Sequence, residues 1–71
     1  MVISKLKNER IRRGWSLQTL GFHAGINAAD ISKIENGRML LYPSQAERLA
    51  RVLGLPPDEL QKPAEAEAVG A

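Results

Sequence analysis

The stretch from residue 16 to residue 37 constrains the fold more than any other part of this chain, because its pattern is that of two short helices joined by a tight turn. The first helix is predicted by apolar or small residues at the spacing of one helical face: Leu17, Leu20, Gly21 and Ala24. Ser16 before them is a good N-cap, since its hydroxyl can accept a hydrogen bond from an unpaired backbone N–H. Gly25 after them can adopt the left-handed conformation in which many helices end.

The second helix of the pair is predicted to carry an apolar back and a short, hydrogen-bonding front. Asn27 can N-cap it, with Asp30 as an imperfect capping-box partner, and Gly37 supplies its stop. Ile31 and Ile34 face inward at helical spacing. The opposite face carries Ala29, Ser32, Lys33 and Asn36. A helix of this kind, presented by a tight turn, is suited to the major groove of DNA.

In these residues the sequence resembles the Cro/C1-type helix-turn-helix regulators, which include the lambdoid phage repressors. The most specific match is the run Ile-Glu-Asn-Gly at 34–37. The other matching positions are Arg10, 14–16, Leu20, 24–26, 31–33, 43–44, 49–50, 53–55 and 58–60. The resemblance covers residues 2–61, and it implies an all-α fold, a compact bundle of five short helices similar to the lambda repressor DNA-binding domain.

The helices outside the pair are predicted from the residues themselves. An apolar stripe that begins with Val2, Ile3 and Leu6 indicates a first helix over residues 2–13. A fourth helix is predicted to open with a capping box, Ser44-x-x-Glu47, and to bury the stripe Ala46, Leu49, Ala50 and Leu53 before it ends at Gly54. Residues 56–59, with two prolines and two acids, indicate a short fifth helix, after which Leu60 returns to the core.

The last ten residues differ in composition from the rest. Residues 62–71 are rich in alanine and glutamate, contain a proline and a glycine, and have no apolar stripe. We therefore expect one helix-turn-helix domain over residues 1–61 and a disordered tail over residues 62–71.

Charge is distributed unevenly along the chain. Residues 1–38 hold seven Lys or Arg against three acids, a net charge of +4, whereas residues 39–71 hold three against five, a net charge of −2. A basic half that contains the helix pair is expected of a phosphate-binding face.

The resemblance implies which residues position the DNA backbone. They are Ser16, Gln18, Lys33, Asn36 and Arg38, with Arg10 and Arg12 behind them. The family commonly has glutamine where this chain has Leu17, so Gln18 and backbone amides are the expected substitutes. Arg10 and Glu35 match a pair that forms an internal salt bridge in lambdoid repressors, which leaves structural support and DNA contact both open for Arg10.

The resemblance likewise implies that base edges are read from the start of the second helix of the pair. The matching positions are Asn27, Ala28, Ala29, Asp30, Ser32 and Lys33. Family members often carry glutamines where this chain has the two alanines. An alanine methyl can touch a thymine methyl, Lys33 can reach guanine, and Asp30 either caps its own helix or accepts from a cytosine amine.

The loop after the pair is unusually apolar. Arg38 is followed by Met39, Leu40, Leu41 and Tyr42, where family members usually have polar and basic residues. Three interpretations are open: burial under the domain's own helices, a dimer or partner surface that includes Pro56, and membrane association. The dimer interpretation follows from the position of this region in lambdoid repressors.

Together these features predict a sequence-specific regulator of transcription that binds double-stranded DNA. We expect a repressor that binds an inverted repeat as a homodimer, with the helix at 28–36 in the major groove. The alternative is an antitoxin-like or other protein-interaction module that uses the loop 39–42. One histidine, no cysteine and no Gly-rich phosphate loop predict that the protein is not an enzyme and has no metal or cofactor. The lack of a long apolar run or a signal-peptide pattern predicts a cytoplasmic protein that does not enter a membrane.

Overall fold

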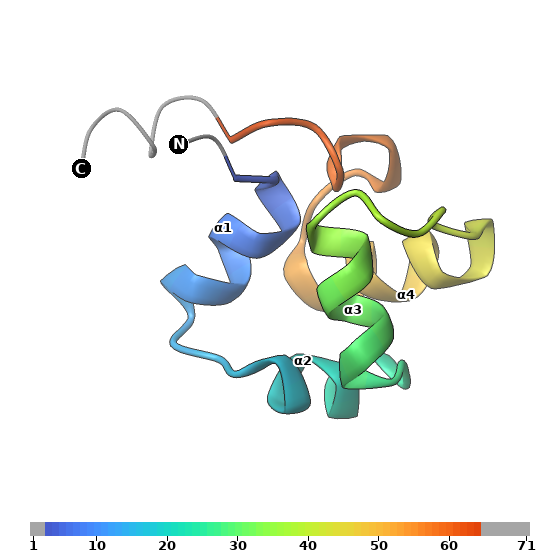
Figure 1. Cartoon of the computed structure of the whole chain (residues 1–71). Helices are drawn as coiled ribbons and strands as arrows, with labels where there is room; N and C mark the ends of the chain where they lie inside the picture. Colours follow the sequence, from blue (N-terminus) through green and yellow to red (C-terminus); the bar gives the residue numbers. More distant parts are fainter. Residues whose placement is uncertain (1–2, 65–71) are drawn as a thin grey trace.

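The computed structural model describes residues 3–64, which form four α-helices and one short 3-10 turn (Figure 1). The elements are α1 (Lys5–Arg12), α2 (Leu17–Ala24), α3 (Ala28–Glu35), α4 (Pro43–Leu53) and η1 (Pro57–Glu59). The predicted all-α fold is confirmed for this part of the chain. The predicted count of five helices is slightly off, because the segment predicted as the fifth forms only a three-residue 3-10 turn. The carbonyls of Leu60 and Lys62 accept hydrogen bonds from the backbone of α1 instead of continuing a helix.

The core lies where all the elements meet. Its six fully buried large side chains are Leu6, Leu20, Ile31, Ile34, Leu49 and Leu60. Each α-helix contributes at least one of them, and Leu60 is added by the segment after η1. A fully buried leucine or isoleucine contributes about 1.5–3 kcal/mol to folding relative to an exposed one, so each of these six positions is a substantial source of stability.

The first helix is shorter than its apolar pattern predicts. Ser4 is its N-cap, and the Ser4 hydroxyl accepts from the backbone N–H of Lys7 at 3.1 Å. Ile3 lies before the helix, and Val2 lies outside the described residues. Ile11 is about half exposed and therefore does not extend the buried stripe of Leu6. The helix ends at Arg12 with Arg13 as its C-cap, and Gly14, whose φ is 71°, then turns the chain toward α2.

The start of α4 differs from the prediction. Its N-cap is Tyr42, and Pro43 is its first residue, a position at which the missing proline N–H costs nothing. The Gln45 side chain accepts from the Tyr42 backbone N–H at 3.1 Å. The predicted capping box of Ser44 and Glu47 is therefore wrong by two residues. The predicted buried stripe holds: Leu49, Ala50 and Leu53 are buried and Ala46 packs against the core.

Residues 62–64 belong to the fold, so the prediction of a disordered tail from Lys62 onward is wrong at these three positions. The Lys5 N–H donates to the Lys62 carbonyl and the Ala64 N–H donates to the Ile3 carbonyl, both at 2.8 Å. An antiparallel bridge joins Ser4 and Pro63, and Ala64 is buried. The rest of the predicted tail, residues 65–71, lies outside the described residues.

No helix within residues 3–64 is long and apolar enough to cross a membrane.

Candidate nucleic-acid interface

The helix pair forms as predicted, and its turn depends on two glycines. Gly25 has a φ of 70° and ends α2 with a bond from its N–H to the Gly21 carbonyl. Gly21 is buried where the turn folds back, and its carbonyl also accepts from the Ile26 N–H at 3.0 Å. A methyl group on Gly21 would overlap the backbone carbonyl oxygen of Ile26. An alanine at this position would therefore not fit the turn unchanged.

The start of α3 is capped by Asn27, whose side-chain Oδ1 accepts from the Ala29 N–H at 2.7 Å. Within residues 3–64 Asp30 makes no hydrogen bond, so the predicted capping box with Asp30 is absent there. Ala29 and Lys33 are exposed and Ala28, Asp30 and Ser32 are half-buried, whereas Ile31 and Ile34 face the core. The predicted apolar back and small polar front of this helix are both present.

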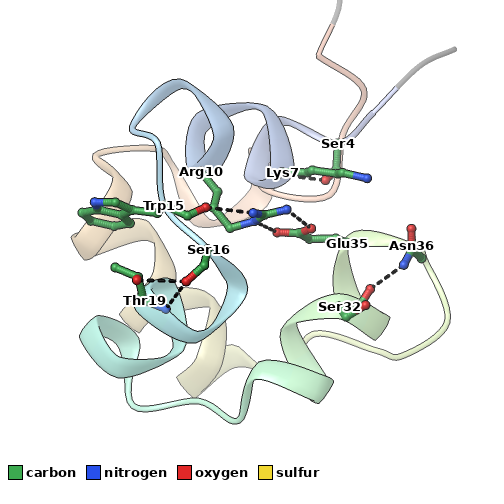
Figure 2. A network of polar contacts seen from close by, with 9 residues as sticks. All are labelled: Ser4, Lys7, Arg10, Trp15, Ser16, Thr19, Ser32, Glu35 and Asn36. Atoms are coloured by element: carbon green, nitrogen blue, oxygen red, sulfur yellow. Dashed lines mark hydrogen bonds and ion pairs between the residues drawn. The ribbon is translucent and has the colours of Figure 1, made fainter.

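Arg10 and Glu35 form a two-pronged ion pair that locks α3 to α1 (Figure 2). Arg10 Nε lies 2.7 Å from Glu35 Oε2, and Nη2 lies 3.0 Å from Oε1. Arg10 Nη1 donates to the Trp15 carbonyl at 2.9 Å, which ties in the loop before α2. The side chains are 12% and 3% exposed. Of the two roles left open for Arg10, the geometry supports the structural one.

Ser16 caps α2 as predicted. Its Oγ accepts from the Thr19 N–H at 3.0 Å and lies 2.9 Å from Thr19 Oγ1 (Figure 2). The N–H groups of Leu17 and Gln18, in the first turn of α2, make no backbone hydrogen bond within the described chain, and the Gln18 side chain is exposed. The N-terminal end of α2 can therefore donate hydrogen bonds to an anionic oxygen.

The basic half of the chain is less available to phosphates than its net charge indicates. Glu9 lies 2.8 Å from Arg12 Nη1 and 3.0 Å from Arg13 Nε, and Glu59 pairs with Lys5. Together with Arg10, four of the seven basic residues thus face a carboxylate. Lys33 and Arg38, by contrast, are exposed and have no ion pair within residues 3–64. Arg12 is therefore a weaker candidate for phosphate binding than Lys33 and Arg38.

Arg48 is a basic residue near the helix pair that the sequence analysis missed. It lies on α4, and its Nη1 is 3.5 Å from the Gly25 carbonyl in the turn between α2 and α3. No local pattern signals it, because α4 is remote from the motif in sequence.

Asn36 lies at the C-terminal end of α3, where its side-chain amide is partly engaged. Its Nδ2 donates to the Ser32 carbonyl at 2.9 Å (Figure 2). Its Oδ1 makes no hydrogen bond within the described residues. Asn36 thus contributes to ending α3 and keeps an acceptor on the exposed surface.

The apolar loop is buried in part, as one of the three interpretations expects. Met39 and Leu41 pack against the core, whereas Leu40 is 80% exposed and Tyr42 60% exposed. The Gln61 amide Nε2 lies 3.4 Å from the Ile34 carbonyl and 3.5 Å from the Met39 carbonyl, so it connects the loop to the end of α3. Burial accounts for two of the four residues and leaves the other two on the surface.

Of the two aromatic residues near α2, Trp15 is packed against the core and Phe22 is exposed. Trp15 packs against the core and stacks on His23 with ring centroids 4.6 Å apart, while the Arg13 guanidinium lies 5.2 Å from the Trp15 centroid. The ring is held by the protein itself, so the role of Trp15 is structural. Phe22 meets His23 edge-on and is 82% exposed.

Comparison with known proteins identifies the arrangement. A family model described as a helix-turn-helix domain matches residues 4–62. The chain belongs to the helix-turn-helix family. Its structure is similar to the high-resolution crystal structure of the restriction-modification controller protein C.AhdI from Aeromonas hydrophila, with a TM-score of 0.69 and 28% sequence identity over 76% of this chain and 82% of that chain. No curated protein matches.

These findings confirm the resemblance to the Cro/C1-type regulators. As a member of this helix-turn-helix family, the chain is a DNA-binding regulator of transcription.

Proposed function

We propose that this helix-turn-helix protein is a repressor that binds an inverted-repeat operator as a homodimer, with α3 in the major groove. The observation that carries the proposal is the rigid presentation of α3. Its back is buried through Ile31 and Ile34, its end is held by the Arg10–Glu35 pair, and its front is exposed. A helix fixed in this way reaches base edges without first being ordered.

Contacts to the DNA backbone are assigned to groups that the protein leaves free. Lys33 and Arg38 are exposed cations, and Gln18 lies beside the open amides at the start of α2. Asn36 and Ser16 complete the set as hydrogen-bonding groups. Arg48, beside the turn, is added to it. Because phosphate contacts release counterions, this set predicts a steep fall of affinity with salt.

The homodimer is assigned to the exposed half of the apolar loop, Leu40 and Tyr42, together with the exposed Pro56. A domain this small offers few base contacts, and two copies double them. In a two-fold dimer the recognition helices lie about 34 Å apart, which corresponds to half-sites one turn of DNA apart.

The decisive experiment is selection of bound sequences from a random duplex pool, followed by binding measurements at two salt concentrations. An enriched inverted repeat with half-sites about 10 base pairs apart supports the proposal. If no sequence is enriched and the weak binding disappears with salt, the proposal is wrong. Sedimentation of the L40S/Y42S double variant tests the dimer surface, because both side chains are exposed and their loss should lower association without unfolding the chain.

A second candidate function is a protein-interaction module, antitoxin-like in that one face binds DNA and another a protein. The observation that favours it is the exposure of Leu40, Tyr42 and Phe22. The L40S/Y42S variant separates the candidates. A dimer surface predicts weaker operator binding in this variant, whereas a surface for another protein predicts unchanged binding.

A further inference from the structure

The polar side chains around α3 differ in whether they are free to meet a base. The Asn27 carbonyl oxygen is bonded to the Ala29 N–H, the Asn36 amide nitrogen to the Ser32 carbonyl, and the Glu35 carboxylate to Arg10. These bonds shape the helix and hold it in place. They also remove from base recognition several groups that its sequence offers.

Two charged groups on α3 are not engaged in this way. Within residues 3–64 neither the Asp30 carboxylate nor the Lys33 ammonium makes a hydrogen bond or an ion pair, either with other residues or with each other. Ala29, next to Asp30, is exposed and contributes only a methyl group. Besides the Ser32 hydroxyl and the free Asn36 oxygen, the face that enters the groove therefore presents a carboxylate, a cation and a methyl group, and the carboxylate and the methyl group belong to consecutive residues.

A free carboxylate on this face is a filter for base identity. It approaches a strand of phosphates, so it weakens binding unless a donor on the DNA meets it. The donors that the major groove offers are the amines of cytosine and adenine, and carboxylates pair with the cytosine N4 amine. Thymine and guanine place carbonyl acceptors at the corresponding edge, and these repel Asp30.

The methyl group of Ala29, the residue before Asp30, restricts further which base can be recognised. On the groove edge of cytosine, carbon C5 is bonded to C4, which carries the amine. A methyl group at C5 therefore lies directly beside the N4 donor. Adenine has a donor without such a methyl group, and thymine has the methyl group without the donor. A base that offers both together is 5-methylcytosine.

We propose that the first turn of α3 reads 5-methylcytosine, with Asp30 accepting from the N4 amine and the Ala29 methyl group contacting the 5-methyl group. This inference rests on the proposed placement of α3 in the major groove. Lys33, one turn further along the helix, then meets the O6 and N7 acceptors of a nearby guanine. The protein thereby responds to cytosine methylation within its own operator.

The test compares full-length chain binding to the selected duplex with cytosine, 5-methylcytosine or thymine at each cytosine position, measured by fluorescence anisotropy. At one position in each half-site, 5-methylcytosine should bind about fourfold more tightly than cytosine, the factor expected for burying one methyl group. Thymine at that position should bind more weakly than either. Equal or weaker binding of the methylated duplex at every position would overturn the inference.

Variants test separately the contact of Asp30 with the N4 amine and the contact of Ala29 with the 5-methyl group. D30N should lose the discrimination against thymine at that position. Its matched control, E47Q, removes one carboxylate from the exposed surface of α4 and should leave base preference unchanged. A29G should keep the preference for cytosine and lose the fourfold advantage of 5-methylcytosine. If its melting temperature falls, the comparison is made at a temperature at which both A29G and the wild type are fully folded. A D30N variant that still rejects thymine would contradict the role of Asp30.

The outcomes also separate this inference from the function on which it rests. If the unmodified pool yields no enriched sequence, and a pool prepared with 5-methylcytosine yields none either, the proposed operator binding fails. If an inverted repeat is enriched but methylation has no effect at any cytosine, the operator binding stands and the reading of 5-methylcytosine alone is wrong.

Discussion

The Arg10 guanidinium and the Glu35 carboxylate meet in two hydrogen bonds of 2.7 and 3.0 Å, although the residues are 25 positions apart in the chain. This contact sets the position of α3 relative to α1. It also gives a structural reason for the most specific match to the family, residues 34–37, because Glu35 in this run stabilises the fold.

The first prediction concerns this pair. Removing one partner, as in E35Q or R10M, leaves a nearly buried charge without its counterpart and should lower the free energy of unfolding by about 3–5 kcal/mol. Urea unfolding followed by Trp15 fluorescence measures it. The exposed pair of Arg12 and Glu9 provides the control, since R12M should cost at most about 1 kcal/mol. A double variant, R10M/E35L, should recover much of the loss. Equal costs for R10M and R12M would contradict this account.

The second prediction sets sterics against helix propensity at Gly21. Propensity alone predicts that G21A stabilises α2 by about 1 kcal/mol. The added methyl group would overlap the Ile26 carbonyl oxygen, so we expect G21A instead to destabilise the protein by about 1–3 kcal/mol. Thermal melting gives the sign. Q18A, an exposed change in the same helix, should be nearly neutral, and a higher melting temperature for G21A would show that the turn relaxes freely.

The third prediction tests where the folded domain ends. A chain that stops after residue 64 keeps the hydrogen bonds of Lys62 and Ala64 to the residues around α1, whereas one that stops after residue 61 loses both. At about 0.5–1.5 kcal/mol for each bond, the shorter chain should be less stable by about 1–3 kcal/mol. Chemical denaturation of the two chains measures the difference. Equal stability would place the boundary at residue 61 after all.

The fourth prediction concerns acid. Hydrogen bonds from Lys5 and Lys62 hold the pKa of Glu59 below its usual 4.5, and the Glu59 carboxylate raises the pKa of Lys62. A carboxyl group whose pKa is lower in the folded state contributes stability above its unfolded pKa, and this contribution disappears as the pH falls through the folded value. The difference in melting temperature between the wild type and E59Q should therefore be present at pH 7 and shrink below about pH 4.5. A difference that is constant down to pH 2 would show that Glu59 acts without its charge.

The sequence predicted the parts of the fold that depend on neighbouring residues. Ser16, Gly25 and Asn27 each bond to a backbone group within four residues along the chain, so the helix pair could be located from the sequence. Residues 62–64 could not, because their partners are residues 3–5 at the other end of the chain. The start of α4 was misplaced because Ser44 and Glu47 have the spacing of a capping box, whereas Pro43 already occupies the first helical position.

The candidate site was predictable to the same extent. The positions on α3 follow from helical spacing, and their exposure agrees with it. The number of basic residues does not tell how many of them are free to bind phosphate, because Glu9 forms ion pairs with both Arg12 and Arg13. Nor does any local signal place Arg48 beside the turn at Gly25.

The bridge between Ser4 and Pro63 has a consequence for how the domain can be rewired. Residues 3 and 64 lie together, at the opposite end of the molecule from the first turn of α3 (Figure 1). A short linker could join them, and a new start could then be opened in the exposed loop near Leu40, giving a circular permutant with the same core. A protein joined at residue 3 or at residue 64 would start from the same side of the domain, away from the first turn of α3.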